Sequence, residues 1–449
     1  MPAYDPFKPI HLQHPHARLR ASVIPFGLTI QSLTLDSADG GEQQTDLIVA
    51  PQNPKDHLDA GRNFFGPVIG RFANRLPAGN LKLDLADGQR LNVDVPEFSA
   101  GGVSLHGGPA PASLSSPDSI EQKGPFDRAI WQHVADADSQ LFFNSGYTSQ
   151  PGAESPASSA IFAIESPHGD NGYPGRLRVE VLVAVLPASA ATEGETRSPL
   201  LGTSEGSFLI RYRAKILDDV AATPLNLTQH WGFNLSSSST KPEARSEQGR
   251  IDKHIVQLYP VDPAKGVKRL GLDAKMIADG TVIDLSKPDD EGQRHDWDAP
   301  DGKVIDHGRL SSGYDHFYVW GPAGGLASSD AADLCHERAR RMRVTSDTTG
   351  ISLTFHSNQA GTQIYCTEGQ PPAPAPADKS GGEMKYVHRR NVEGEGKLGN
   401  GQRSAIMIEF GAPHCGFLHS SLEQWGGGAS LLKKGEVYDN WVTCQAWQK

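Results

Sequence analysis

The chain has 449 residues, a formal net charge of −11 at pH 7, 48 glycines, 32 prolines and four cysteines. The negative charge argues against a nucleic-acid backbone as partner, and no apolar run is long enough to span a bilayer. The cysteines are far apart, which suits reduced thiols better than a disulfide framework or a zinc site. With no apolar leader at the N-terminus, we expect a cytoplasmic protein that binds neither nucleic acid nor membrane.

Short β-strands separated by turn residues are predicted along the whole chain. Residues 22–35 have strand composition with a break at Pro25, and in residues 176–186 apolar side chains alternate with period two. The best candidate for a helix is short and covers residues 331–341. The sequence therefore predicts an all-β protein. Further strands are predicted at residues 207–217, 226–235, 351–355, 362–365 and 404–410.

Segments rich in Pro, Gly, Ser and Ala interrupt this pattern. The three longest are residues 107–124, 187–206 and 370–400. Such compositions bury little apolar area, and they predict surface loops inserted between strands. No break separates two folded blocks of different character. We therefore interpret residues 1–449 as one domain.

The first polar motifs lie near the N-terminus. Residues 66–76 contain Asn74 next to Arg75, which places an amide beside a forked donor of the kind that binds hydroxyl groups. The alternative is that Arg71 or Arg75 forms a structural ion pair. His106 enters a glycine turn at residues 107–108, and by itself it could be a loop histidine in solvent.

The most unusual strand covers residues 226–235. It carries two asparagines, a threonine, a glutamine and His230 among apolar residues, and polar groups on a buried strand need hydrogen-bond partners. His230 is a candidate proton donor, because the unperturbed pKa of histidine lies near neutrality. The alternative is a core histidine bonded to a backbone carbonyl. Trp231 or Trp320 could supply an aromatic platform for a sugar.

Three polar residues follow in the C-terminal half. Asp315 precedes an apolar strand and is either a turn cap or a ligand for hydroxyl groups, and Gln363 lies in a predicted strand. Glu409 ends the apolar run 405–408, where half-burial would raise its carboxyl pKa to a range suited to a general base. The alternative is a strand-end glutamate in water.

In this order, the motifs resemble those of the aldose 1-epimerase (galactose mutarotase) family. Residues 70–75 (GRFANR) look like the family's GRxANR motif, and residues 224–235 resemble its TPxNLTNHxYFNL motif. The resemblance extends from about residue 24 to residue 438. It also includes residues 105–108 with 126–131, 166–175, 280–284, 314–316, 361–365 and 435–438.

The resemblance implies a large antiparallel β-supersandwich that interconverts the α- and β-anomers of free hexoses such as galactose or glucose. It implies that His230 is the general acid and Glu409 the general base. It implies a small-molecule sugar as partner, no metal and no organic cofactor, and a monomer or weak dimer. The residues that would bind sugar hydroxyls are Asn74, Arg75, His106, Asp315 and Gln363.

The chain departs from the family's pattern at several of these motifs. Gln229 stands where the family usually has Asn, and Phe317 replaces the Asn after Asp-His. Glu409 is followed by Phe-Gly-Ala-Pro rather than Thr-Gln, which makes Glu423 a rival for the base. We favour Glu409, because an apolar strand leads into it.

Two other functions stay open from the sequence. A hexose-6-phosphate 1-epimerase would need a basic cluster near the sugar's C6, and the sequence has no obvious one. A noncatalytic sugar-binding protein on the same scaffold would require His230 or Glu409 to point away from the sugar.

Overall fold

The computed structural model describes most of the chain. The described residues are 4–38, 40–41, 44–59, 62–85, 88–143, 145–152, 156–188, 197–198, 201–236, 251, 253–285, 303–304, 314–322, 333–335, 337–367 and 403–449. The loop predicted at 370–400, and half of the loop predicted at 187–206, lie outside these residues.

The described part of the chain is almost entirely β-structure. Its strands are β1 (Ile10–Gln13), β2 (Leu19–Ile24), β3 (Thr29–Asp36), β4 (Gln44–Asp46), β5 (Val68–Ile69), β6 (Arg75–Pro77), β7 (Gly79–Asp84), β8 (Arg90–Val95), β9 (Val103–Leu105), β10 (Gln132–Val134), β11 (Ser159–Ser166), β12 (Leu177–Leu186), β13 (Arg197–Ser198), β14 (Gly202–Ile216), β15 (Ala222–Pro224), β16 (Thr228–Gln229), β17 (Trp231–Phe233), β18 (His254–Leu258), β19 (Lys268–Leu272), β20 (Ala278–Asp284), β21 (Lys303–Val304), β22 (Asp315–Val319), β23 (Arg340–Ser346), β24 (Ile351–Ser357), β25 (Gly361–Cys366), β26 (Ile406–Gly411), β27 (Leu431–Lys433) and β28 (Tyr438–Gln448).

Helical structure in the described residues is limited to short turns. They are α1 (Asp56–Asp59) and the 3₁₀ turns η1 (Phe126–Arg128), η2 (Asp136–Asp138), η3 (Asp170–Gly172), η4 (Asp333–Cys335), η5 (Glu337–Ala339), η6 (Gly416–Leu418), η7 (Ser420–Trp425) and η8 (Gly427–Ser430). None of the described helices is long and apolar enough to cross a membrane. The prediction of an all-β fold is confirmed.

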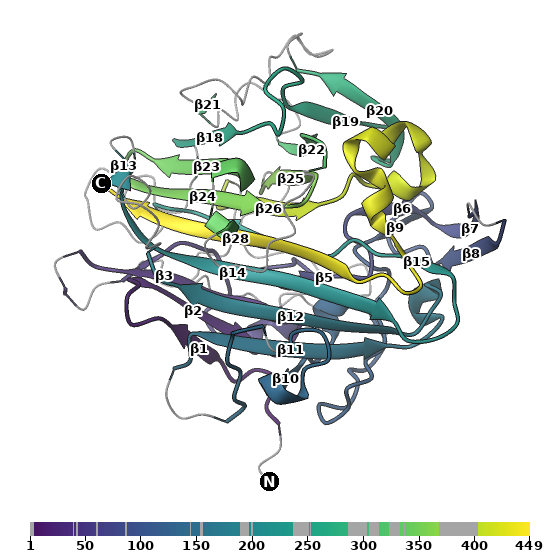
Figure 1. Cartoon of the computed structure of the whole chain (residues 1–449), viewed down its shortest axis with the longest axis horizontal. Coiled ribbons are helices and arrows are strands. Elements are labelled where there is room, and N and C mark those ends of the chain that lie inside the picture. The colour runs from purple at the N-terminus through teal and green to yellow at the C-terminus, as the bar shows by residue number, and fades with distance from the viewer. Residues whose placement is uncertain are drawn as a thin grey trace.

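Three larger antiparallel sheets organise the described strands (Figure 1). The ten-stranded sheet runs in the order β10-β11-β12-β14-β28-β24-β23-β18-β21, with β13 paired to β14. The six-stranded sheet has the order β17-β26-β25-β22-β19-β20, and the four-stranded sheet has the order β1-β2-β3-β4. The two-stranded sheets are β15-β27, β16-β5, β6-β9 and β7-β8.

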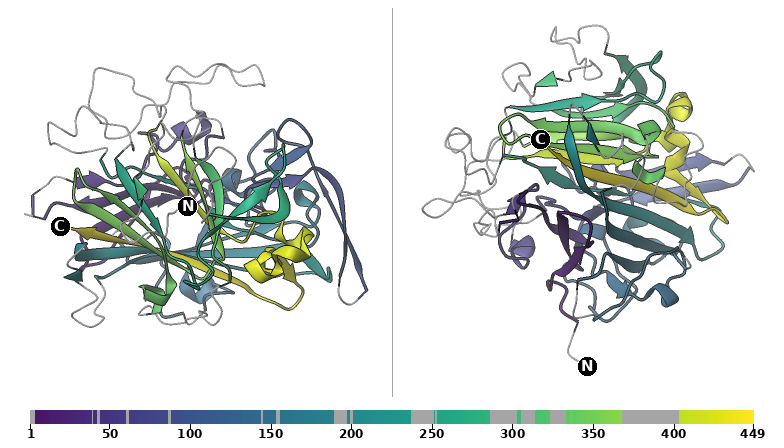
Figure 2. Two further views of the ribbon diagram at one scale, coloured as in Figure 1. Left: turned by 90° about the horizontal axis from the view of Figure 1, so that it is seen from above. Right: turned by 60° about the vertical axis from the view of Figure 1, so that its left-hand side comes forward.

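The main hydrophobic core lies between the long sheet and the two smaller ones. It joins Val181 of the long sheet, Ile30 of the four-stranded sheet and Ile408 of the six-stranded sheet. The left view of Figure 2 shows the shorter strands on one side of the long sheet. Trp231 and Trp320 belong to this core, where their rings pack against Phe355 and Phe410 respectively. The expectation that either one is a sugar platform is therefore wrong.

The predicted strand at 176–186 is confirmed as β12, and it is buried on both faces. Its polar residues Arg178 and Glu180 form a buried ion pair of 2.8 Å. Glu180 also accepts hydrogen bonds from the Ser139 hydroxyl and from the backbone N–H groups of Gln140 and Leu141. Buried charges are tolerated when they are paired and hydrogen-bonded in this way.

Two sequence-based boundaries differ from the structure. The helix predicted at 331–341 is replaced by the turns η4 and η5, and the strand β23 already begins at Arg340 because it pairs with β24. The loop predicted at 187–206 ends by Gly202, where β14 begins and Thr203 pairs with Gln448 of β28. Both differences arise from strand pairing over long sequence distances, which local composition does not encode.

Candidate active site

His230 lies where the chain passes from one sheet to another. The preceding residues form β16, which pairs with β5, and the following residues form β17, which pairs with β26. The predicted strand 226–235 is thus two short strands. The His230 N–H donates to the Pro67 carbonyl at 2.9 Å, and its carbonyl accepts from the Gly66 N–H at 2.8 Å. Its backbone is therefore fixed on both sides.

Gln229 and the two asparagines of this motif bind backbone groups. Gln229 donates to the carbonyls of Leu28 and Gly66. Asn226 donates to the Ala412 carbonyl at 3.1 Å and accepts from the Ala412 N–H at 3.0 Å. These contacts explain how the segment carries amide side chains in a buried position. The Gln229 side chain stabilises the surrounding backbone and is not part of the pair formed by His230 and Glu409.

The six-stranded sheet brings three of the expected site residues to one face. Gln363 of β25 pairs with Glu409 of β26 on one side and with Phe317 of β22 on the other. Directly opposed residues project on the same face, and so do residues two apart along a strand, which adds Asp315. The Gln363 side-chain amide donates to Asp315 Oδ1 at 2.5 Å.

Arg75 and Arg71 have different roles. Arg75 lies 3.8 Å from Asp315 and keeps part of its side chain exposed. Arg71 is buried and donates to the Ser166 hydroxyl and to the carbonyls of residues 166, 167, 174 and 175. Arg71 therefore anchors the turn at residues 166–175, and burial lowers its pKa to about 10.

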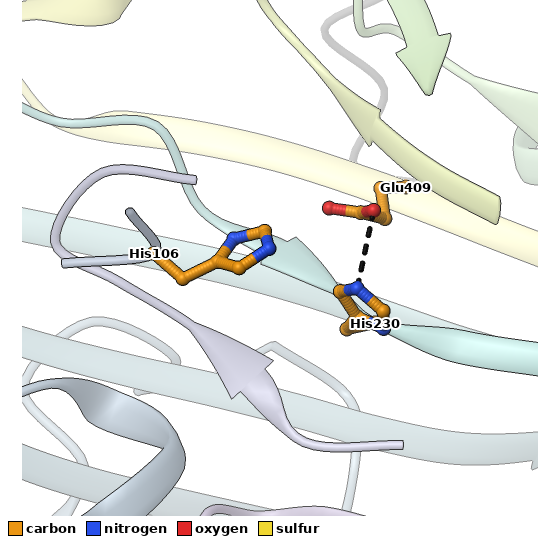
Figure 3. A group of neighbouring side chains, drawn as sticks. All are labelled: His106, His230 and Glu409. Carbon is orange, nitrogen blue, oxygen red and sulfur yellow. Dashed lines mark ion pairs between the residues drawn. The ribbon is translucent and has the colours of Figure 1, made fainter. Parts of the chain in front are cut away.

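His230 and Glu409 point toward one another (Figure 3). The His230 Nε2 atom lies 3.3 Å from Glu409 Oε1, and both side chains are almost fully buried. Asn74 donates to the other carboxyl oxygen of Glu409 at 3.3 Å. The structure thus brings a histidine and a carboxyl group within proton-transfer distance.

His106 is oriented by the backbone of Asn74. The strands β6 and β9 pair Arg75 with Leu105, which places Asn74 opposite His106. The Asn74 N–H donates to His106 Nδ1 at 3.1 Å, so a neutral ring carries its proton on Nε2. Burial, followed by the nearby His230, holds the pKa of His106 well below its usual value. The ring is therefore a neutral hydrogen-bond donor.

The ligand atoms of His106, His230 and Glu409 lie within 4.8 Å of one another, a spacing that could hold a metal ion. The hydrogen bonding of His106 does not fit a metal ion. Its Nδ1 lone pair accepts the Asn74 N–H, and its Nε2 carries the remaining proton. A metal ligand needs a free lone pair on a neutral imidazole. The arrangement suits proton transfer and hydroxyl binding instead.

Burial shifts the pKa values of Glu409 and His230 in opposite directions. It raises the pKa of Glu409 to about 8, with a further increase from Asp315, while Arg75 and the Asn74 hydrogen bond lower it. Burial lowers the pKa of His230 to about 4, against smaller increases from the carbonyls of His230 and Phe64. The facing pair therefore holds one proton between about pH 4 and pH 8.

The rival residue Glu423 lies elsewhere. It belongs to η7, and its side chain is exposed. The site instead includes residues that sequence reasoning did not select, among them Phe64, Arg62 and His414. The double phenylalanine at 64–65 and the Pro-His pair at 413–414 were visible in the sequence, but nothing local marked them as neighbours of His230 or Arg75.

His414 is a buried histidine beside the site. Neither ring nitrogen has a partner among the described residues, and the ring centroid lies 4.4 Å from that of Phe317. The next residue, Cys415, donates to the Arg75 carbonyl at 3.1 Å, which places this segment beside the site. Burial, followed by Arg75, lowers the pKa of His414 to about 3.

We expect His414→Phe to leave the free energy of unfolding unchanged or to raise it by about 1 kcal/mol. A buried polar group without a partner costs about 1–3 kcal/mol, and phenylalanine removes that cost while keeping a planar aromatic ring at this position. Urea unfolding measures the change. The matched control is His254→Phe, because His254 Nε2 accepts the Leu235 N–H at 2.9 Å and its loss should destabilise. Equal destabilisation of both variants would contradict the expectation.

Comparison with known proteins gives consistent likenesses. A family model described as aldose 1-epimerase matches residues 8–128. The chain is 25% identical over 347 residues to galactose mutarotase from Homo sapiens, covering 77% of this chain and 74% of that protein. It is 25% identical over 369 residues to aldose 1-epimerase from Escherichia coli, covering 82% of this chain and 84% of that protein.

Two crystal structures share the fold. An aldose epimerase homologue from C. elegans superposes with a TM-score of 0.59 at 16% identity, covering 98% of this chain and 99% of that one. Galactose 1-epimerase from Lactobacillus acidophilus gives a TM-score of 0.55 at 17% identity, covering 98% of this chain and 93% of that one. The expected β-supersandwich of the galactose mutarotase type is thus confirmed.

Proposed function

Because the chain belongs to the aldose 1-epimerase family, we propose that it interconverts the α- and β-anomers of a free aldohexose. The observation that carries the proposal is the buried pair of His230 and Glu409, whose Nε2 and Oε1 atoms lie 3.3 Å apart. A sugar whose anomeric hydroxyl and ring oxygen bridged this pair would meet a proton acceptor and a proton donor together.

In the proposed reaction, Glu409 takes the proton of the C1 hydroxyl while His230 Nε2 gives a proton to the ring oxygen. The bond from C1 to the ring oxygen breaks, and C1 becomes an aldehyde. Rotation about C1–C2 turns the aldehyde, and the reverse transfers close the ring on its other face. Each group ends in its starting protonation state, so no net proton is consumed.

The proton must lie on His230 when the sugar binds, whereas burial holds it on Glu409 in the free protein, with a pKa of about 8 for Glu409 and about 4 for His230. Arg75 and Asn74 stabilise the Glu409 carboxylate, while Asp315 and Asp127 stabilise a protonated His230. Moving the proton from Glu409 to His230 takes up no proton from solvent. The pair can therefore reach its working state at constant pH.

Asp315, Gln363 and Arg75 would bind the hydroxyl groups away from C1. They form one chain of contacts on the sheet face, with Gln363 and Arg75 both reaching Asp315. Carboxylate, amide and guanidinium groups together offer donors and acceptors to several hydroxyls. His106 would add a neutral N–H donor on the other side of the pair.

The charge around the pair favours a free sugar over a phosphorylated one. Arg75 lies beside Asp315, and Arg62 binds Asp127 at 2.7 Å. Within the described residues, each arginine that contacts this group of side chains thus already faces a carboxylate. A phosphate group would have to compete with Asp315 and Asp127 for these arginines, and both carboxylates would repel it.

The optical rotation of fresh α-D-glucose and α-D-galactose tests the proposal. We expect the purified protein to speed the relaxation of both sugars toward the rotation reached in buffer, and to speed that of glucose 6-phosphate less. A rate equal to that in buffer for all three would reject an epimerase. If calorimetry then detected sugar binding, the chain would be a noncatalytic sugar-binding protein on this scaffold.

The pH dependence should be bell-shaped. We expect kcat/KM to fall as pH drops through about 4, because a second proton reaches the pair and Glu409 loses its role as acceptor. We expect it to fall again as pH rises through about 8, because the shared proton is lost and no donor remains. Initial rates across this range give the profile, and a single rising limb would contradict the one-proton pair.

A further inference from the structure

The half-buried side chain of Phe64 lies against both histidines of the site. Its ring centroid is 4.6 Å from that of His106 and 5.4 Å from that of His230. The two imidazoles themselves meet edge to face at 5.3 Å. Trp231 and Trp320 lie in the core. Among the described residues, Phe64 is the phenylalanine, tyrosine or tryptophan whose ring contacts both histidines.

The position of Phe64 is fixed from two directions. Its backbone has a left-handed φ of 53°, which is strained for a bulky residue, and its carbonyl accepts the Gly66 N–H at 3.0 Å. The Arg62 guanidinium stacks 4.8 Å from the ring centroid. Arg62 is held in turn by Asp127 and by the His106 carbonyl. The ring therefore cannot shift without disturbing the loop that carries His106.

We propose that Phe64 is the platform on which the apolar face of the sugar ring stacks while His230 and Glu409 act on C1 and the ring oxygen. This inference rests on the proposed function. A pyranose presents C–H groups on one face, and their slightly positive hydrogens suit the negative face of an aromatic ring. The hydroxyl groups at the rim of the sugar point sideways, toward donors and acceptors such as His106 and Asp315.

The platform contributes to binding and leaves the chemistry to His230 and Glu409. Stacking contacts the sugar ring in the closed ground state and near the transition state alike, so its loss should raise KM and Kd together. The expected change is roughly three- to tenfold. The kcat value should stay within about twofold, and the limits of the pH profile should not move, because the backbone carbonyl beside His230 is retained.

The test compares Phe64→Leu with Phe98→Leu. Both rings stack on Arg62, at 4.8 Å and 4.3 Å, but only Phe64 has ring contacts with the histidines in the described part of the chain. Any effect that passes through Arg62 should appear in both variants. Calorimetry with galactose gives Kd, and polarimetry gives kcat, KM and the pH profile. Phe64→Tyr keeps the aromatic face and should restore affinity.

The outcomes separate the platform from the proposed function. If wild type is inactive but binds galactose, the epimerase proposal fails, and weaker binding by Phe64→Leu alone still supports the platform. If wild type is active and Phe64→Leu matches Phe98→Leu in Kd, the platform is overturned. A lower kcat or a shifted pH profile in Phe64→Leu overturns it too, because Phe64 would then only position His230. Absence of sugar binding by wild type overturns both proposals.

Discussion

Glu409→Gln should lower kcat by at least about a hundredfold, because a positioned proton acceptor typically contributes about 10²–10⁴-fold. Glutamine keeps the size of the side chain and can still accept the Asn74 hydrogen bond, which the wild-type carboxyl accepts at 3.3 Å. It cannot take the C1 hydroxyl proton near neutral pH. Sugar affinity should therefore survive, and calorimetry with galactose measures it beside the polarimetric kcat.

The matched control is Glu423→Gln, which should change kcat by less than about threefold because exposed substitutions away from a site rarely matter. If Glu423→Gln were the inactive variant and Glu409→Gln stayed active, the assignment of the C-terminal motif would be wrong by fourteen residues. If both stayed active, the proposed acid–base mechanism would have to be abandoned for a binding protein.

His230→Asn should nearly abolish anomer interconversion and leave the protein folded. Asparagine cannot donate an acidic proton to the ring oxygen, and the backbone hydrogen bonds of residue 230 to Pro67 and Gly66 do not depend on its side chain. Polarimetry measures the rate, and a cooperative thermal transition checks the fold. A variant with more than about a tenth of the wild-type kcat would not fit a group that contributes two or more decades.

The sequence could predict the fold class because strand composition and turn residues repeat along the whole chain. It could also nominate the site residues, because the motif around His230 and the run leading to Glu409 resemble those of one family. It could not predict their contacts. The row of Phe317, Gln363 and Glu409 depends on the register of three strands that are far apart in the sequence.

Other features were hidden for the same physical reason. The buried partners of Arg71 are backbone carbonyls near residues 166 and 175, which no residue type announces. Trp231 follows His230 in the sequence, but its ring packs in the core against Phe233 and Phe355. Phe64 lies near His230 because β5, which follows Phe64 in the chain, pairs with β16, which precedes His230. Pairing partners, rather than local pattern, decide which aromatic ring lies at the site.

If one buried proton shared by His230 and Glu409 drives anomer exchange, NMR exchange spectroscopy can detect that exchange in a galactose solution already at anomeric equilibrium. We expect magnetisation transfer between the α and β anomeric protons in the presence of wild type, and none above the buffer level with Glu409→Gln or His230→Asn. Equal transfer with wild type and with both variants would contradict this expectation.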